Sequence, residues 1–124
     1  TVADLNNDLW PDFIVGINDG QVMAFENRGF SANRLLKVRL QGKPGNPTAV
    51  GARISVHLDD GSTQTAEVHA GGGYLSQSTS ALVFGLGQSA RVERITVQWP
   101  DGTSSTTTSA ALDRRSITIK QSTL

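Results

Sequence analysis

The stretch RISVHLDDGSTQTAEV, residues 53–68, decides the fold class of this chain. Asp60-Gly61 tolerates the positive φ angles of a tight hairpin turn. A period of two on the strand before it places one set of side chains inward and the other in water. We therefore expect a β-hairpin near residues 52–69. The alternating residues are the apolar Ile54, Val56 and Leu58 and the polar Arg53, Ser55 and His57.

Asp-Gly turns recur at two further places, Asp19-Gly20 and Asp101-Gly102. Each lies between strand-like runs, so we expect hairpins near 13–25 and 92–107 as well. Further strands are expected near 35–41, 81–86 and 116–120. The predicted core consists of Leu36, Val38, Leu40, Ile54, Val56, Leu58, Phe84, Ile95, Val97, Trp99, Ile117 and Ile119.

Composition excludes several classes of function. The 124 residues suffice for one core and a small appendage but are too few for two full domains. Lys plus Arg and Asp plus Glu both number 11, so no global field attracts nucleic acid or an anionic membrane. No apolar run approaches the roughly 20 residues that span a bilayer. The absence of cysteine removes disulfides, thiolate catalysis and cysteine zinc sites.

These patterns predict an all-β chain whose main part, residues 34–124, is an antiparallel β-sandwich or small barrel. Residues 1–28 are expected to form an acidic loop and one hairpin, and residues 29–33 a connection. The only helical candidate is a short turn around Ser109 to Asp113. The chain is expected to be a fragment of a longer protein, cut inside a repeat, with any export signal outside it.

The acidic loop DLNNDLWPD, residues 4–12, immediately precedes a strand. Hard oxygen ligands at this spacing suit Ca²⁺, which takes six to eight of them. The expected ligands are the side chains of Asp4, Asn6, Asp8 and Asp12 and the backbone carbonyl of Trp10. An alternative is an acidic turn in which the aspartates cap backbone amides. No Lys or Arg lies within the loop, so without a cation its carboxylates repel one another.

The sequence DLNNDLWPDFIVGINDGQVMAFEN, residues 4–27, resembles an FG-GAP repeat, the calcium-loop unit of integrin-type β-propellers. The five expected ligands match that unit's ligand positions. Leu9 departs from the pattern, because a small residue, usually Gly, is common there. The resemblance implies an N-terminal calcium-loop β-hairpin, and the bulky Leu9 puts its affinity in question.

Four short motifs lie between residues 51 and 102: Gly51-Ala52-Arg53, Gly72 to Gln77, Phe84-Gly85-Leu86-Gly87 and Val97 to Gly102. Taken together they resemble the ASPIC/UnbV domain, and the resemblance covers nearly all of residues 35–120. It implies an extracytoplasmic module without established catalytic activity, in the cartilage acidic protein-like family, where this domain follows FG-GAP repeats.

The leading functional hypothesis is therefore a non-enzymatic, extracellular or periplasmic calcium-binding module for binding or adhesion, with an unknown protein or glycan partner. A carbohydrate-binding module is the alternative, with Trp10, Tyr74 and Trp99 as candidate platforms. Tyr74 is expected to be exposed, and Trp99 to be core. A metal-assisted hydrolase is less favoured, because paired carboxylates occur only in the acidic loop, where calcium held by four side chains has little capacity left for chemistry. His57 and His69 suggest no catalytic triad, so no activated nucleophile is indicated.

Overall fold

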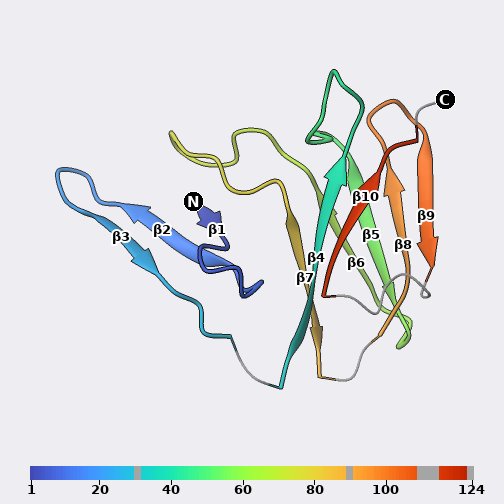
Figure 1. Ribbon diagram of the computed structural model, residues 1–124, viewed down its shortest axis with the longest axis horizontal. Helices are drawn as coiled ribbons and strands as arrows, with labels where there is room; N and C mark the ends of the chain where they lie inside the picture. Colours follow the sequence, from blue (N-terminus) through green and yellow to red (C-terminus); the bar gives the residue numbers. More distant parts are fainter. Residues whose placement is uncertain (30–31, 89–90, 109–114, 123–124) are drawn as a thin grey trace.

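The structure, a computed structural model, describes residues 1–29, 32–88, 91–108 and 115–122. Figure 1 shows a two-layered β-sandwich from which a long β-hairpin projects. The described residues contain strands and no helix, so the expected all-β class is confirmed. The turn predicted around Ser109 to Asp113 lies outside the described residues. None of the described elements is a helix that could cross a membrane.

Three sheets make up the described structure. The first sheet of the sandwich has the order β10-β4-β7 (Ser116–Lys120, Arg34–Gln41, Leu82–Gly87). The second has the order β6-β5-β8-β9 (Thr63–Glu67, Arg53–Leu58, Val92–Gln98, Ser104–Thr108). The projecting sheet has the order β1-β2-β3 (Val2–Ala3, Asp12–Gly16, Val22–Phe25). Each hairpin and strand expected from the sequence is present, and β1 is an addition to them.

One strand pair of the sandwich is parallel. β10 runs alongside β4 with Ile117 opposite Val38 and Ile119 opposite Leu40, whereas β4 and β7 are antiparallel. Parallel partners need a long connection, and here the chain passes through the whole second sheet before β10 returns to β4. Local alternation does not encode this direction, since it is the same in parallel and antiparallel neighbours.

The core lies between the two sheets of the sandwich. Every residue expected in it is buried except Ile117, which is partly buried and packs against it. Trp99 is buried as predicted, and its indole N–H donates to Ser105 Oγ at 2.8 Å, so its polar atom is satisfied. The sequence analysis missed smaller core residues outside the clearest alternating runs: Ala49, Ala52, Val68 and Val92.

The turns after Asp60 and Asp101 share one hydrogen-bonding pattern. Each carboxylate accepts bonds from the backbone N–H and the hydroxyl two residues later, Ser62 and Thr103, at 2.6–3.1 Å. The intervening glycine has φ near +83°, a value that side chains disfavour. The Thr103 hydroxyl, and next the Lys43 ammonium, lower the pKa of Asp101 to about 2. These Asp-Gly pairs therefore fix the sandwich hairpins, as the sequence predicts.

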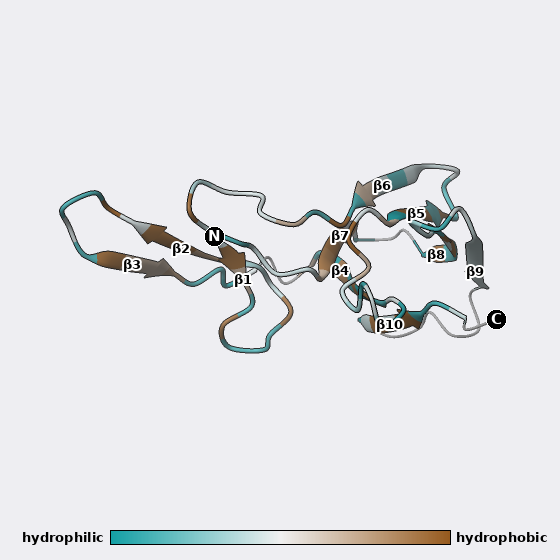
Figure 2. Cartoon of the chain, turned by 90° about the horizontal axis from the view of Figure 1, so that it is seen from above, coloured by the Kyte–Doolittle hydropathy of each residue, from teal (hydrophilic) through white to brown (hydrophobic). Residues whose placement is uncertain are grey.

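The projecting sheet joins the sandwich through β1 and the glycine-rich loop before β7, residues 70–79. The backbone N–H of Thr79 donates to the Val2 carbonyl at 3.1 Å, and the Val2 N–H donates to Ser78 Oγ at 3.1 Å. The Thr1 hydroxyl also donates to the Gln77 carbonyl. Residues 77–79 thus hold β1 through one backbone and two side-chain hydrogen bonds. Figure 2 shows the rest of the hairpin as an arm that points away from the sandwich.

Truncation of Ile95 to Ala tests the register of the sandwich. Ile95 lies fully buried on β8 opposite Val56, so the cavity left by this change should lower the free energy of unfolding by about 2–5 kcal/mol. The control is Tyr74→Ala, whose side chain is 95% exposed and should cost under about 0.5 kcal/mol. Chemical denaturation measures both, and a surface-like cost at Ile95 would contradict this packing.

Candidate metal centre at the acidic loop

The acidic loop makes its turns with left-handed backbone at two non-glycine residues. Asn7 has φ of 62° and Leu9 has φ of 79°. Asn tolerates this region well, but a branched aliphatic residue pays about 1–2 kcal/mol for it. The structure thus supplies the physical reason why a small residue would suit position 9 better than Leu.

The middle of the loop is held by side chains that accept bonds from its own backbone. The Trp10 N–H donates to Asp8 Oδ1 at 2.8 Å, and the Asp8 N–H donates to Asn6 Oδ1 at 3.1 Å. The Asn6 amide also donates to Asp8 Oδ2 at 3.0 Å. These bonds are the amide-capping contacts of the acidic-turn alternative.

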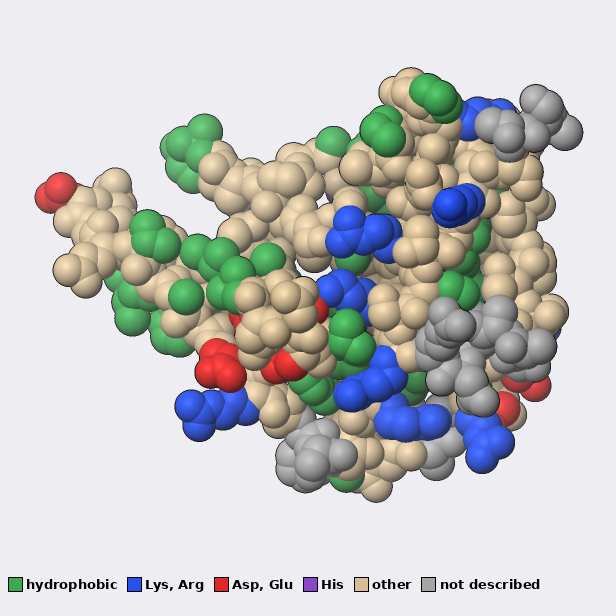
Figure 3. Space-filling model, in the orientation of Figure 1, with side chains coloured by type: hydrophobic (Ala, Val, Ile, Leu, Met, Phe, Trp, Pro, Cys, Tyr) green, Lys and Arg blue, Asp and Glu red, His purple; other side chains and the backbone are tan. Residues whose placement is uncertain are grey.

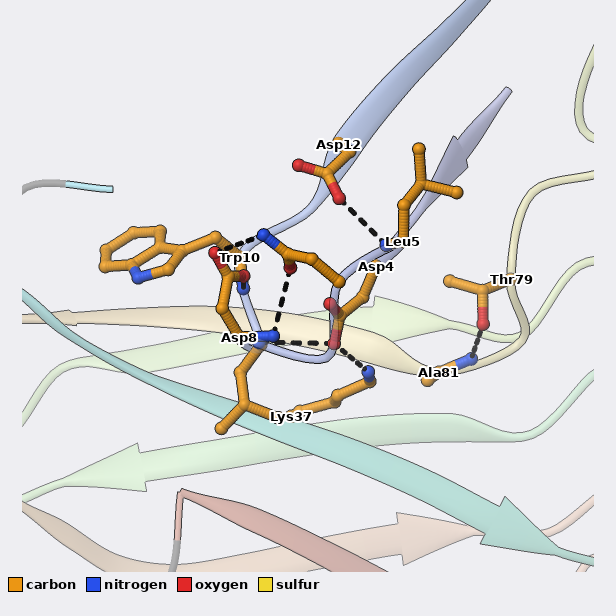
Figure 4. Close-up of polar contacts among 10 residues, drawn as sticks. Asp4, Leu5, Asp8, Trp10, Asp12, Lys37, Thr79 and Ala81 are labelled. Carbon is orange, nitrogen blue, oxygen red and sulfur yellow. Dashed lines mark hydrogen bonds and ion pairs between the residues drawn. The ribbon is translucent and has the colours of Figure 1, made fainter. Parts of the chain in front are cut away.

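Asp12 is the most buried polar residue of the N-terminal segment, with 1% of its surface exposed. Its two oxygens accept backbone N–H groups from opposite sides, Leu5 at 2.8 Å and Asn27 at 2.8 Å. Asp12 therefore ties the start of the loop to the end of the hairpin. Figure 4 shows its carboxylate turned toward the Leu5 nitrogen.

Asp4 is paired with a cation from the sandwich. Its Oδ2 lies 2.7 Å from the Lys37 ammonium of β4, and the two side chains are only 6% and 16% exposed. The same oxygen accepts the Leu9 N–H at 3.2 Å. The bond from Lys37 lowers the pKa of Asp4, although burial opposes that shift. Figure 4 shows Lys37 reaching the loop from below.

The second oxygen of Asp4 has no such contact. Oδ1 is buried and has no hydrogen-bond partner among the described residues. A buried carboxylate oxygen without a partner is costly, so it marks a place where a positively polarised group would be stabilised. Within the described ranges, however, no three His, Cys, Asp or Glu side chains lie close enough to form a metal site as they stand.

The five residues expected as ligands thus occupy one turn of chain but have different surroundings. Asp8 and Asn6 bond within the loop, Asp12 bonds to two backbone amides, and Asp4 bonds to Lys37. Trp10 lies half-buried, with its ring where a Cβ on Gly29 would overlap it. The sequence analysis missed Lys37 because nothing in the local spacing connects it with a loop 33 residues earlier.

The aromatic candidates for a sugar platform are separated by burial. Tyr74 is exposed as predicted, Trp10 is half-buried and Trp99 is core. Of the two histidines, His57 contacts hydroxyl groups of Thr63 and Thr96 on its sheet. His69 lies near Glu67 at the surface, with 3.9 Å between His69 Nδ1 and Glu67 Oε1.

Comparison with known protein families matches residues 42–123 to the family described as ASPIC and UnbV. The chain belongs to the ASPIC and UnbV family. The matched region contains every strand of the sandwich except β4, which pairs with two of them. A search of curated proteins finds no match. The division of this ASPIC/UnbV chain into an N-terminal segment (1–28), a connection (29–33) and a sandwich domain (34–124) stays a prediction.

Replacement of Asp12 by Asn tests its role as a tie within the loop. Asn presents an N–H group where the wild type has a second acceptor, so one of the two backbone amides loses its partner. Hydrogen exchange at Leu5 or Asn27 should accelerate about 10- to 100-fold, which corresponds to about 1–3 kcal/mol. Asp19→Asn, in the exposed hairpin turn, is the control and should leave both rates unchanged. Unaltered exchange in Asp12→Asn would contradict the assigned contacts.

Proposed function

We propose that this ASPIC/UnbV chain is a non-enzymatic, extracytoplasmic module for binding or adhesion, in which residues 1–28 act as a partial FG-GAP repeat that takes up calcium. The observation that carries the calcium proposal is the buried, unpartnered Oδ1 of Asp4 inside a loop rich in oxygen side chains. Extracellular modules bind calcium at concentrations that exist outside the cell, which suits an exported protein.

The donor chemistry of the loop fits calcium. Asp4, Asn6 and Asp8 offer hard oxygens at alternate positions, and Trp10 offers a backbone carbonyl. Asp12 is the remaining candidate, and its carboxylate retains lone pairs beyond the two N–H groups that it accepts. Calcium would neutralise carboxylates that otherwise repel one another. Binding would exchange the bond between Asn6 and Asp8 for contacts with the ion.

Lys37 and Leu9 both argue for modest affinity. The Lys37 ammonium already neutralises part of the charge of Asp4 and repels a second cation on that carboxylate. Leu9 adopts a left-handed backbone conformation that is strained for Leu, whereas Gly would adopt it without strain. A dissociation constant on the order of 10⁻⁴–10⁻³ M is therefore expected, as in other extracellular calcium modules.

The exposed apolar side chains support a role in binding. They lie on the hairpin arm and at the tip of the glycine-rich loop, where Figure 3 shows hydrophobic groups in green. Apolar side chains that are exposed together in this way often mark a site of contact with a partner. The residues concerned are Phe13, Val15, Ile17, Val22, Met23, Phe25, Tyr74 and Leu75.

These exposures favour a protein partner over a glycan. A sugar platform of two aromatic rings needs a second exposed ring beside Tyr74, and Trp99 is buried in the sandwich core. The apolar arm is extended and aliphatic as well as aromatic, which suits a protein surface. The carbohydrate alternative therefore rests on Tyr74 alone among the three candidate platforms.

Calorimetric titration with calcium tests the proposal. The wild type should bind in the millimolar range or tighter, and Asp8→Asn should bind at least about tenfold more weakly. Asn at position 8 keeps an oxygen that can accept the Trp10 N–H, so the change removes a charge but retains that cap. Calcium at about 100 times the dissociation constant should stabilise the N-terminal segment by up to roughly 2.7 kcal/mol.

Asp19→Asn is the matched control, because it also removes one carboxylate charge from the N-terminal segment, but in the turn between β2 and β3 and outside the acidic loop. It should bind calcium as the wild type does. Equal heats for the wild type and Asp8→Asn, or no heat at about 10 mM calcium, would return the loop to an acidic turn that is held by its own hydrogen bonds.

A further inference from the structure

A cavity of about 290 Å³ lies where β1 and the acidic loop meet β4 and β7. Its walls are mainly aliphatic, from Val2, Leu9, Pro11, Ala81, Leu82 and Val83. Asp4, Lys37, Ser78 and Thr79 add polar groups to this lining. Largely apolar pockets with a few converging polar groups are typical of small-molecule sites. Neither the proposed calcium ligation nor the exposed hairpin arm accounts for this cavity.

Three polar side chains of the cavity carry protons that no acceptor among the described residues takes. The Lys37 ammonium carries three protons, and its one contact is with Asp4. Ser78 Oγ accepts the Val2 N–H and Thr79 Oγ1 accepts the Ala81 N–H. Neither hydroxyl donates its own proton to another described residue. A ligand in the cavity would therefore be recognised through an acceptor oxygen that faces these donors. Asp4 also lines the cavity and has an unpartnered Oδ1, so it adds a place for a donor of the ligand.

The charge of the cavity favours a neutral ligand. Asp4 lies 2.7 Å from the Lys37 ammonium, so the two charges offset each other. An anion drawn to Lys37 would also meet the Asp4 carboxylate, and a cation drawn to Asp4 would also meet the Lys37 ammonium. A carbonyl or hydroxyl oxygen accepts from Lys37 without adding charge to the ion pair.

We propose that this cavity binds a small neutral ligand with a branched aliphatic body and a carbonyl or hydroxyl head. The body lies against Val2, Ala81 and Val83, and the head accepts from Lys37 and the Ser78 or Thr79 hydroxyl. A volume of 290 Å³ corresponds to about ten water molecules at roughly 30 Å³ each, and a ligand of that size would fill it. The cavity shares Asp4 and Leu9 with the acidic loop, but none of the proposed ligand contacts requires calcium, so binding in calcium-free buffer tests this site separately from the calcium proposal.

Isovaleramide, a neutral branched amide, is the probe for this site. Titration followed by two-dimensional amide NMR should shift the signals of Ala3, Lys37 and Val83, with a dissociation constant on the order of 1–10 mM. Isovalerate and isoamylammonium have the same aliphatic body with a negative or a positive head. The anion and the cation should each bind at least about threefold more weakly, because each meets one like charge of the ion pair.

Val83→Trp should block the cavity from its partly exposed wall and weaken isovaleramide binding at least tenfold. Val22→Trp, on the exposed arm, is the matched control and should bind as the wild type does. If Val83→Trp does not fold, Thr79→Val replaces it as the test. This change keeps the shape of the side chain but removes its hydroxyl, which also accepts the Ala81 N–H, and it should weaken isovaleramide binding. Equal binding of all three probes, no shift with isovaleramide at about 50 mM, or unchanged binding in a folded blocking variant would overturn the proposal.

Discussion

The ion pair between Asp4 and Lys37 is the contact on which the arrangement of the two parts depends. It joins the first turn of the N-terminal loop to the middle of β4 across 33 residues of sequence, and it lies largely out of water. Lys37 is held in place by the sheet, because β4 has β7 on one side and β10 on the other. The sandwich thus presents a fixed cation to a loop that has none of its own.

This contact changes the electrostatics of the loop. Carboxylates without a cation repel one another, and Lys37 relieves that repulsion at Asp4 while backbone amides solvate Asp8 and Asp12. Lys37 engages only one oxygen of Asp4, and the other oxygen stays unpartnered. The proposed calcium ion would therefore act on the part of Asp4 that Lys37 leaves unsatisfied. The ion pair also forms one end of the cavity between the two parts, and so couples the loop to the proposed ligand site.

The sandwich could be predicted from sequence because its signals are local. Alternation in β5 and β8 defines the inward residues Ile54 and Ile95, and the Asp-Gly turns define where the chain reverses. The parallel pairing of β10 with β4 could not be predicted in this way, because alternation carries no direction. Small core residues such as Ala49 and Ala52 were missed since they lie outside the regular strands.

The candidate site could be predicted only in part. The spacing from Asp4 to Asp12 predicts a calcium loop, with an acidic turn as the alternative, and this stays a prediction. The contacts that surround the loop come in part from distant segments. Lys37 belongs to another sheet, and the Asn27 amide that engages Asp12 lies at the far end of the hairpin. Such partners depend on tertiary structure, so no spacing rule within the loop could identify them.

A double-mutant cycle on Asp4→Asn and Lys37→Met tests the central role of this ion pair most directly. Hydrogen exchange at the Thr79 amide, which donates to Val2 across the junction, reports how tightly the N-terminal segment is held. The account predicts a coupling energy of about 0.5–3 kcal/mol between the two changes. Strictly additive effects, with no coupling beyond experimental error, would show that the two side chains do not hold the segment together.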